Sequence, residues 1–327
     1  MTKRAFSCLF ATAALFAPTC VSACACGCGI FEVGADTMMP VQSDSGLSAW
    51  FGIDHMDQNR NFEHGAPAPA ADNSDKRIAT DFYTFGLDYM VSRKWTIGAD
   101  LPLVQRRFTT TAAGANGRAI IETLPLTALG DAQIQLLYTG FSADMSTGLG
   151  FAVKLPTGRD SSPLDRYGNR PYDRDTLPGS GSTDLKLSGY HLGTIAGRLG
   201  WFAQAQYRFA VTTRGGYRPG NEADGALGLT YALDAGHGLA VQPSLQLLGS
   251  LRGHDTGSAA DPLNSGYRRL LIAPGIGARL TRKLSIYGDV EIPIAQFVEA
   301  AASPAIEGTT GQLVAPVLFK LQLNYGF

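Results

Sequence analysis

Three cysteines near the N-terminus are the residues of this chain best suited to chemistry with a soft metal. Cys24, Cys26 and Cys28 alternate with small residues in the stretch SACACGCGIFEVG. Thiolates at this spacing can present sulfur to Cu(I) or Zn(II). No fourth ligand follows nearby, and a structural zinc site normally has four. A metal contact at Cys26 and Cys28 is therefore one interpretation of the cluster.

A second interpretation makes Cys24 a processing point. Lys3 and Arg4 precede the apolar run AFSCLFATAALFAP, and small residues follow at positions 21 and 23, which is typical of a cleavable signal peptide over 1–23. The run is too short for a membrane-spanning helix, which needs about 20 residues. VSAC also resembles a lipobox, in which Cys24 would be diacylated. Plain cleavage after Ala23 uses the same small residues, so both alternatives stay open.

The rest of the chain offers no enzyme or cofactor signature. It contains no GxSxG, HExxH, P-loop or dinucleotide-binding glycine motif, so we expect neither an enzyme nor a cofactor. All five cysteines lie within the first 28 residues, which excludes a disulfide framework for the main body. Without the signal segment the charge is slightly acidic, and this argues against nucleic acid as a partner.

Apolar and polar residues alternate along most of the mature sequence. In KLSIYGDVEI, Leu284, Ile286, Val290 and Ile292 fall on one face, and VLFKLQLNYGF shows the same alternation. A period of two predicts β-strands. We expect twelve of them, at 47–57, 81–91, 95–108, 131–140, 147–156, 184–193, 198–211, 223–233, 238–251, 267–279, 283–295 and 314–327.

The connections between these strands alternate in length. Long segments rich in Gly, Pro, Asn and Asp, among them 58–80, 109–130 and 157–183, alternate with tight turns such as SRK and DAGH. An even number of strands of this length, joined in this way, predicts a transmembrane antiparallel up-and-down β-barrel with long outer loops and short periplasmic turns. The barrel is expected over 46–327, and a Cys-rich periplasmic segment over 24–45.

Aromatic residues add two expectations. A set near the short turns is typical of an interfacial girdle and consists of Tyr89, Trp95, Tyr138, Phe141, Trp201, Tyr231, Tyr325 and Phe327. The chain ends on Phe327 with apolar residues at alternate positions before it, which resembles the C-terminal signal read by the outer-membrane barrel assembly machinery. We therefore expect an outer-membrane location in a Gram-negative cell, with membrane lipid and lipopolysaccharide as further partners.

Three short motifs carry a family resemblance. ALGDAQIQLLYTGF (128–141), VKLPTGRDSSP (153–163) and PGSGSTDLKLSGY (178–190) resemble successive signatures of an outer-membrane transporter family linked to the phenol meta-cleavage (MetA) degradation pathway. Ser180 stands where threonine is usual. CACGCGIFEVG and DHMDQNRN resemble a cysteine-headed subgroup. The resemblance implies a barrel with a transport role. As local structure, LPTG and GSGS are expected to end one strand and begin the next.

Charged residues on the faces opposite the apolar ones are expected to line a lumen. They are Asp54, Asp88, Asp100, Asp131, Lys154, Asp184, Lys186, Arg208, Arg269, Asp289, Glu291 and Lys320. Two interpretations stay open. Charges of both signs can form a constriction that steers ions, or they can pair with one another and fill the interior. The loop 159–175 holds Asp and Arg residues that could bind calcium or lipopolysaccharide phosphate, or be an ordinary solvated loop.

The sequence favours a passive outer-membrane channel or transporter for small solutes, aromatic or hydrophobic compounds among them. The alternative is a non-conducting barrel that acts as a structural or binding component, with a Cys-rich periplasmic head held by metal or lipid. A lumen filled by paired charges, or blocked by residues 29–45 folded inward, would favour this alternative.

Overall fold

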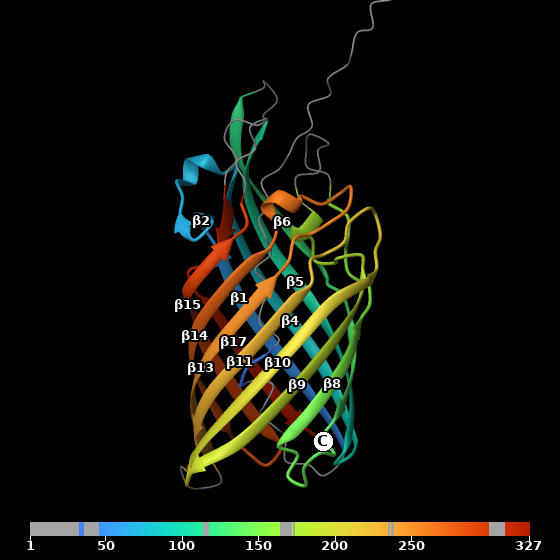
Figure 1. Cartoon of the computed structure of the whole chain (residues 1–327), viewed down its shortest axis with the longest axis vertical. Coiled ribbons are helices and arrows are strands. Elements are labelled where there is room, and N and C mark those ends of the chain that lie inside the picture. The colour runs from blue at the N-terminus through green and yellow to red at the C-terminus, as the bar shows by residue number, and fades with distance from the viewer. Residues whose placement is uncertain are drawn as a thin grey trace, which may run out of the picture.

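A computed structural model describes residues 33–35, 46–113, 118–163, 172, 174–234, 236, 239–300 and 311–327. Twelve strands form one closed antiparallel sheet in which each strand pairs with its neighbours in the chain and the last pairs with the first (Figure 1). The strands are β1 (Gly46–Gln58), β4 (Asp75–Ser92), β5 (Trp95–Ala113), β7 (Gln133–Tyr138), β8 (Thr147–Lys154), β9 (Thr183–Ala196), β10 (Leu199–Thr212), β11 (Glu222–Tyr231), β13 (Ala240–Arg252), β14 (Tyr267–Arg279), β15 (Leu284–Val298) and β17 (Leu318–Gly326). The predicted barrel is confirmed.

Shorter elements lie in the connections. β2 (Arg60–Glu63), β3 (Ala66–Pro67) and β16 (Gln312–Val314) form a small second sheet, and β12 (Leu233–Asp234) extends one short turn. The helices are single 3₁₀ turns, η1 (Ala70–Asp72), η2 (Arg174–Thr176) and η3 (Pro262–Asn264). No helix within the described ranges is both long and apolar enough to cross a membrane.

One predicted loop contains a strand. The segment 109–130, expected to be irregular, holds the end of β5 and the strand β6 (Ala119–Leu129), which pair from Leu103 and Leu129 outward to Ala113 and Ala119. This hairpin rises above the barrel at the top of Figure 1. β6 pairs only with β5 and is therefore an edge strand, where Pro125 is tolerated. The strand was not predicted from the sequence because Pro125 interrupts the alternation of apolar and polar residues around it.

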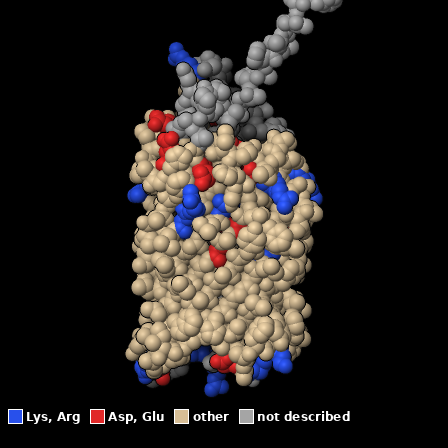
Figure 2. Space-filling view, in the orientation of Figure 1, with Lys and Arg blue, Asp and Glu red and all other residues tan. Residues whose placement is uncertain are grey.

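The barrel wall is apolar outside and mostly polar inside. Side chains of successive residues point to opposite faces of a strand, and the outward set is exposed. On the face drawn in Figure 2, charged residues gather toward the two ends and leave a band without them in the lower half. The exposed apolar residues include Phe85, Leu87, Leu101, Leu103, Ile134, Leu136, Leu227, Leu229, Leu321 and Leu323. A surface of this kind suits hydrocarbon on the outside.

Aromatic rings collect at the end of the barrel that carries the short turns. Tyr138 lies 4.6 Å from Trp95 and 5.0 Å from Phe141, measured between ring centroids. At the C-terminus Tyr325 and Phe327 meet edge to face at 5.2 Å, and both are exposed. The backbone N–H of Phe327 donates to the carbonyl of Leu47 at the start of β1, so the chain end is fastened to the wall. Amphipathic rings favour the level of lipid headgroups.

Candidate channel lumen

A cavity of about 830 Å³ lies along the inside of the barrel. At the short-turn end it is lined by Arg282, Lys283 and Phe327, and at the long-loop end by Pro178 and Pro219. Its walls come from β1, β4, β5, β7, β8, β9, β10 and β17, with Arg252 at the end of β13. The cavity therefore extends between the two ends of the wall and lies against one side of the barrel.

The twelve charged residues expected inside all lie on the inner face, in two groups. The first group lines the cavity and consists of Asp54, Asp88, Asp100, Asp131, Lys154, Asp184, Lys186, Arg208 and Lys320. The second group, Arg269, Asp289 and Glu291, is buried in β14 and β15 with exposed fractions of 7%, 6% and 2%. These three residues belong to the packed side of the interior and do not line the cavity.

Many of these charges have opposite charges beside them. The ammonium of Lys154 lies 2.7 Å from Asp131 and 3.2 Å from Asp184. Arg208 on β10 forms an ion pair with Glu222 on β11. Lys320 of β17 stands at the register position between Asp54 of β1 and Asp289 of β15. Of the twelve residues, Asp131, Lys154, Asp184 and Arg208 thus form ion pairs within the described part of the chain, and both interpretations stay open.

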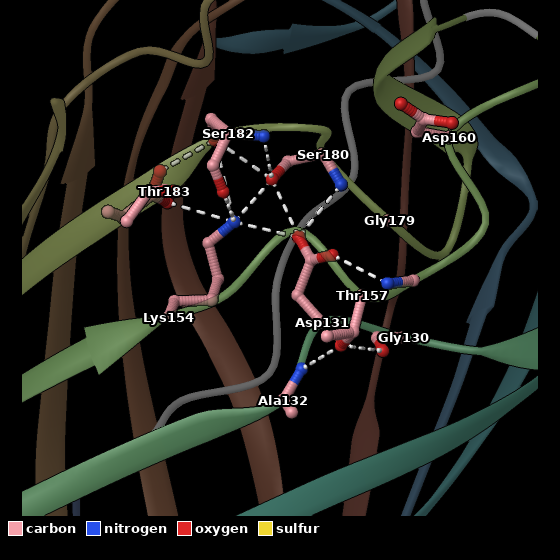
Figure 3. Close-up of polar contacts among 12 residues, drawn as sticks. Gly130, Asp131, Ala132, Lys154, Thr157, Asp160, Gly179, Ser180, Ser182 and Thr183 are labelled. Carbon is pink, nitrogen blue, oxygen red and sulfur yellow. Dashed lines mark hydrogen bonds and ion pairs between the residues drawn. The ribbon is translucent and has the colours of Figure 1, made fainter. Parts of the chain in front are cut away.

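A polar cluster at the long-loop end joins the three motifs that carry the family resemblance (Figure 3). Asp131 from the first motif accepts hydrogen bonds from Lys154 and from the backbone N–H of Gly158, at 3.0 Å, which belong to the second. It also accepts the backbone N–H and the hydroxyl of Ser180, from the third, at 2.9 and 2.7 Å. One carboxylate therefore fixes two loop segments against the end of β8.

Glycines let the same three motifs approach one another closely. A Cβ atom on Gly158 would lie 2.6 Å from the carbonyl carbon of Gly130 and 2.8 Å from Cα of Gly179. A Cβ on Gly179 would lie 2.4 Å from the carbonyl carbon of Gly158. Real Cβ atoms do not come this near to backbone, so these positions require glycine. LPTG and GSGS end and begin strands as predicted, and they also pack against each other.

Arg174 of η2 fastens the closing end of this loop. Its guanidinium donates to the carbonyls of Gly179 and Ser180 at 3.0 and 2.8 Å and lies 3.5 Å from the carboxylate of Asp160. Gly181 has φ +66°, in the left-handed region that favours glycine, and a Cβ there would meet the same guanidinium. Among the described part of the 159–175 loop, Arg174 and Asp160 are thus engaged with the protein itself.

The carboxyl of Asp131 is stabilised in its ionised form. Burial by itself would raise its pKa. The charge of Lys154 and the hydrogen bonds from Lys154 and Ser180 outweigh burial and hold the pKa below its ordinary value. The cluster is therefore a charged, hydrogen-bonded structure at neutral pH.

Other loops close over the long-loop end of the cavity. Asp255, 1% exposed, accepts hydrogen bonds from the hydroxyl of Tyr217 at 2.8 Å, the backbone N–H of Gly220 at 2.7 Å and the guanidinium of Arg252 at 2.6 Å. The guanidinium of Arg174 lies 5.0 Å from the centre of the Tyr217 ring. The loops after β8, β10 and β13 are thus joined into a cover, which we call the loop cover.

A short piece of the N-terminal region lies inside the barrel. The backbone N–H groups of Gly34 and Ala35 donate to the side-chain carbonyls of Gln204 on β10 and Gln246 on β13, each at 3.0 Å. Val33 and Ala35 are buried, 1% and 6% exposed. Gln246 also donates to Asp289 at 2.7 Å, so this anchor is itself held in place.

This piece, Val33–Ala35, is the inner segment. It packs in the main apolar cluster, which contains Met56, Phe202, Ala226, Leu248, Leu271, Ala273, Tyr287, Ala315 and Leu318. These residues come from β1, β10, β11, β13, β14, β15, β17 and the residue run before β17, so the inner segment fills the side of the interior opposite much of the cavity wall. The range 24–45 was expected in the periplasm. Its three described residues lie inside the barrel, enclosed by the wall.

Sequence reasoning named charged residues and overlooked the amides. Gln204 and Gln246, which hold the inner segment, and Gln133 and Gln135, which line the cavity, all sit on inward positions of strands. Glutamines alternating with apolar residues, as in QIQLLY and AQAQY, were the available signal. Cys24, Cys26 and Cys28 lie outside the described residues. Within the described ranges, no group of three metal-ligating side chains is placed to hold an ion.

Comparison with solved structures identifies proteins that share this fold. No family model and no curated protein matches the sequence. Among solved structures, the COG4313 outer membrane channel from Pseudomonas putida F1 is similar with a TM-score of 0.59 and 11% identity, over 87% of this chain and 96% of that one. The β domain of the Bordetella autotransporter Brka is similar with a TM-score of 0.52 and 15% identity, over 87% and 100%. The chain thus has the fold of outer-membrane β-barrels.

Proposed function

We propose that this protein is a passive outer-membrane channel or transporter for small solutes. The observation that carries the proposal is the 830 Å³ cavity, which is lined at one end by residues of the short turns and at the other by residues of the loop cover. In an outer membrane the short turns face the periplasm and the long loops face outward. The description of the similar Pseudomonas putida protein as a channel agrees with this proposal.

The lining favours solutes with an apolar part. Trp50, Phe82, Met90, Tyr190 and Leu192 contribute apolar surface to the cavity between its charged positions. A pocket lined by aromatic and aliphatic side chains with a few polar groups is the common form of an organic ligand site. We infer that small aromatic or hydrophobic compounds are among the solutes. The link to the phenol meta-cleavage pathway remains a prediction based on the resemblance.

Reconstitution tests this function. Refolded protein in planar bilayers should give a measurable conductance, and proteoliposomes should swell in small neutral sugars and in small aromatic alcohols. The Pseudomonas putida channel fold is no substitute for the measurement, because fold alone does not fix function. Absence of both conductance and flux in correctly folded protein would sink the channel proposal.

A second candidate is a non-conducting barrel with a binding or structural role. The inner segment favours it, because Val33–Ala35 fills part of the interior and is held from two strands. In this form the Cys-rich head would act in the periplasm, held by metal at Cys26 and Cys28 or by lipid at Cys24. Intact mass spectrometry of membrane-extracted protein separates the two: a diacylated Cys24 adds the mass of the lipid, and a bound metal is lost on acidification.

The remaining partners follow from the proposed location. The apolar outer wall suits outer-membrane lipid and lipopolysaccharide. The exposed Phe327 at the chain end is proposed as the contact for the barrel assembly machinery. Deleting Phe327 should then lower the amount of folded barrel in the outer-membrane fraction while refolding in detergent proceeds unchanged. If the outer-membrane fraction held as much folded barrel of the deletion variant as of the parent, this role would be contradicted.

A further inference from the structure

One carboxylate of the cavity wall, Asp88, has a neutral amide as its hydrogen-bond partner. Asp88 on β4 faces the cavity, and its carboxylate accepts a hydrogen bond from the neutral amide of Gln135 at 3.3 Å. Across the described residues, no Lys or Arg nitrogen lies within 4.0 Å of it, whereas Asp131 and Asp184 share Lys154. Asp88 thus presents a negative charge to the cavity without a cationic neighbour in contact.

Two glycines make the room for this arrangement. A Cβ on Gly98 of β5, the residue paired with Asp88, would lie 2.2 Å from its carboxylate oxygen. A Cβ on Gly86 would lie 1.9 Å from the indole ring of Trp50 and 2.1 Å from its nitrogen. Gly86 and Asp88 are two residues apart on the inward face of β4, so the indole and the carboxylate lie side by side.

The indole completes the chemistry of the site. Trp50 lines the cavity, and its indole nitrogen lies beside Gly86, two residues along β4 from Asp88. Tryptophan has the ring face that attracts cations most strongly. A charged ammonium carrying a few carbons would find the indole for its alkyl groups and the carboxylate for its charge. Within the described residues no group of three metal-ligating side chains is placed to hold a metal ion, and an anion would meet repulsion from Asp88.

We propose that Asp88 and Trp50 form a subsite for small organic cations that carry their charge on an ammonium group. The subsite lies in the short-turn half of the lumen, four residues from the end of β4, at Ser92, and four from the start of β1, at Gly46. Arg282 and Lys283 line the mouth at the same end, where their positive charges attract anions. The subsite rests on the proposed function to the extent that solutes reach it through the lumen.

Equilibrium binding of tetramethylammonium tests the subsite. The chain has three tryptophans, and Trp95→Phe with Trp201→Phe leaves Trp50 as the only indole. Added tetramethylammonium should change the fluorescence of Trp50 along a saturable curve in detergent-solubilised protein. The neutral tert-butanol, of similar shape, should bind at least about tenfold more weakly, which corresponds to about 1.4 kcal/mol.

Substitutions separate charge from shape. Asp88→Asn keeps the size and the contact with Gln135 and should weaken tetramethylammonium binding about tenfold, leaving tert-butanol unchanged. Asp234→Asn makes the same change in an exposed short turn outside the cavity and should leave both unchanged. Heat-dependent mobility on gels checks that each variant is folded.

The outcomes distinguish the subsite from the channel. Equal affinity for tetramethylammonium in the parent and in Asp88→Asn, equal affinity for the two probes, or no saturable binding would overturn the subsite. Swelling of proteoliposomes in a neutral sugar, measured on the same preparation, reports passage through the lumen independently. Sugar flux without charge-selective binding of tetramethylammonium would overturn the subsite alone, and such binding without flux would overturn the channel alone.

Discussion

The carboxylate of Asp131 and the ammonium of Lys154 lie 2.7 Å apart, although 22 residues of β7, β8 and their turn separate them in the sequence. Their side chains are 6% and 13% exposed. The pair and the backbone N–H groups of Gly158 and Ser180 make one hydrogen-bonded unit at the end of the barrel wall. This unit positions the loop between β8 and β9 over the cavity.

Replacing the carboxylate should destabilise this end of the barrel. Asp131→Ala leaves the N–H groups of Gly158 and Ser180 without their acceptor and removes one partner of Lys154. Unpaired buried donors are costly, and we expect a loss of about 3 kcal/mol in the free energy of unfolding. Urea unfolding of refolded protein measures it. Asp234→Ala, in an exposed turn, is the control, and an equal loss there would contradict the assignment.

The same carboxyl should make stability depend on acid pH. Its pKa is lowered in the folded state because Lys154 and Ser180 outweigh the effect of burial. The contribution is therefore fully present above the ordinary carboxyl pKa and is lost as pH falls through the lowered folded value. The urea midpoint of the parent should fall on acidification more steeply than that of Asp131→Asn. Parallel curves for the two proteins would argue against an ionised Asp131.

The close approach of Gly158 and Gly179 should leave no room for a side chain at either position. Gly179→Ala would place a Cβ within 2.4 Å of the backbone of Gly158 and should lower stability by about 1–3 kcal/mol. Gly249→Ala is the matched control, because the nearest atom to its Cβ is a leucine methyl at 3.9 Å. Thermal unfolding followed by gel mobility compares them. A neutral effect of Gly179→Ala would show that the two loop segments separate readily.

Opening the loop cover should increase access to the cavity. Asp255→Ala removes the acceptor of Tyr217, Gly220 and Arg252 and leaves the guanidinium of Arg252 without this partner, a change that costs about 3 kcal/mol at a buried site. We expect faster proteolysis of the loops after β10 and β13 and a larger conductance. His254→Ala, at an exposed neighbouring position, should change neither. Unaltered cleavage in Asp255→Ala would show that the cover is held elsewhere.

Releasing the inner segment should widen the conducting path. Ala35→Asp introduces a charge at a position that is 6% exposed within the apolar cluster, and burying an unpaired charge is strongly unfavourable. The segment should leave the interior while the strands stay paired. Single-channel conductance should therefore rise with gel mobility unchanged, and Ala35→Val should conduct like the parent. If Ala35→Asp conducts like the parent as well, the inner segment does not limit the passage.

The two-residue alternation was sufficient to predict the wall. Each strand has one face toward lipid and one toward the interior, so its outward residues must be apolar, and this requirement is written locally in stretches such as 314–327. Loop lengths then gave the up-and-down order. The exception was β6, where Pro125 interrupted the pattern and the strand pairs above the barrel, beyond the part where lipid imposes alternation.

Contacts across the interior could not be predicted in this way. The inward position of Asp88 followed from alternation, but its lack of a cationic neighbour depends on which strands close the barrel and in which register. The same holds for Gln246, whose amide reaches a backbone group 211 residues away. Local sequence determined which residues face the lumen. Closure of the sheet decided which of them meet, because pairing partners in a barrel are fixed only when all the strands are in register.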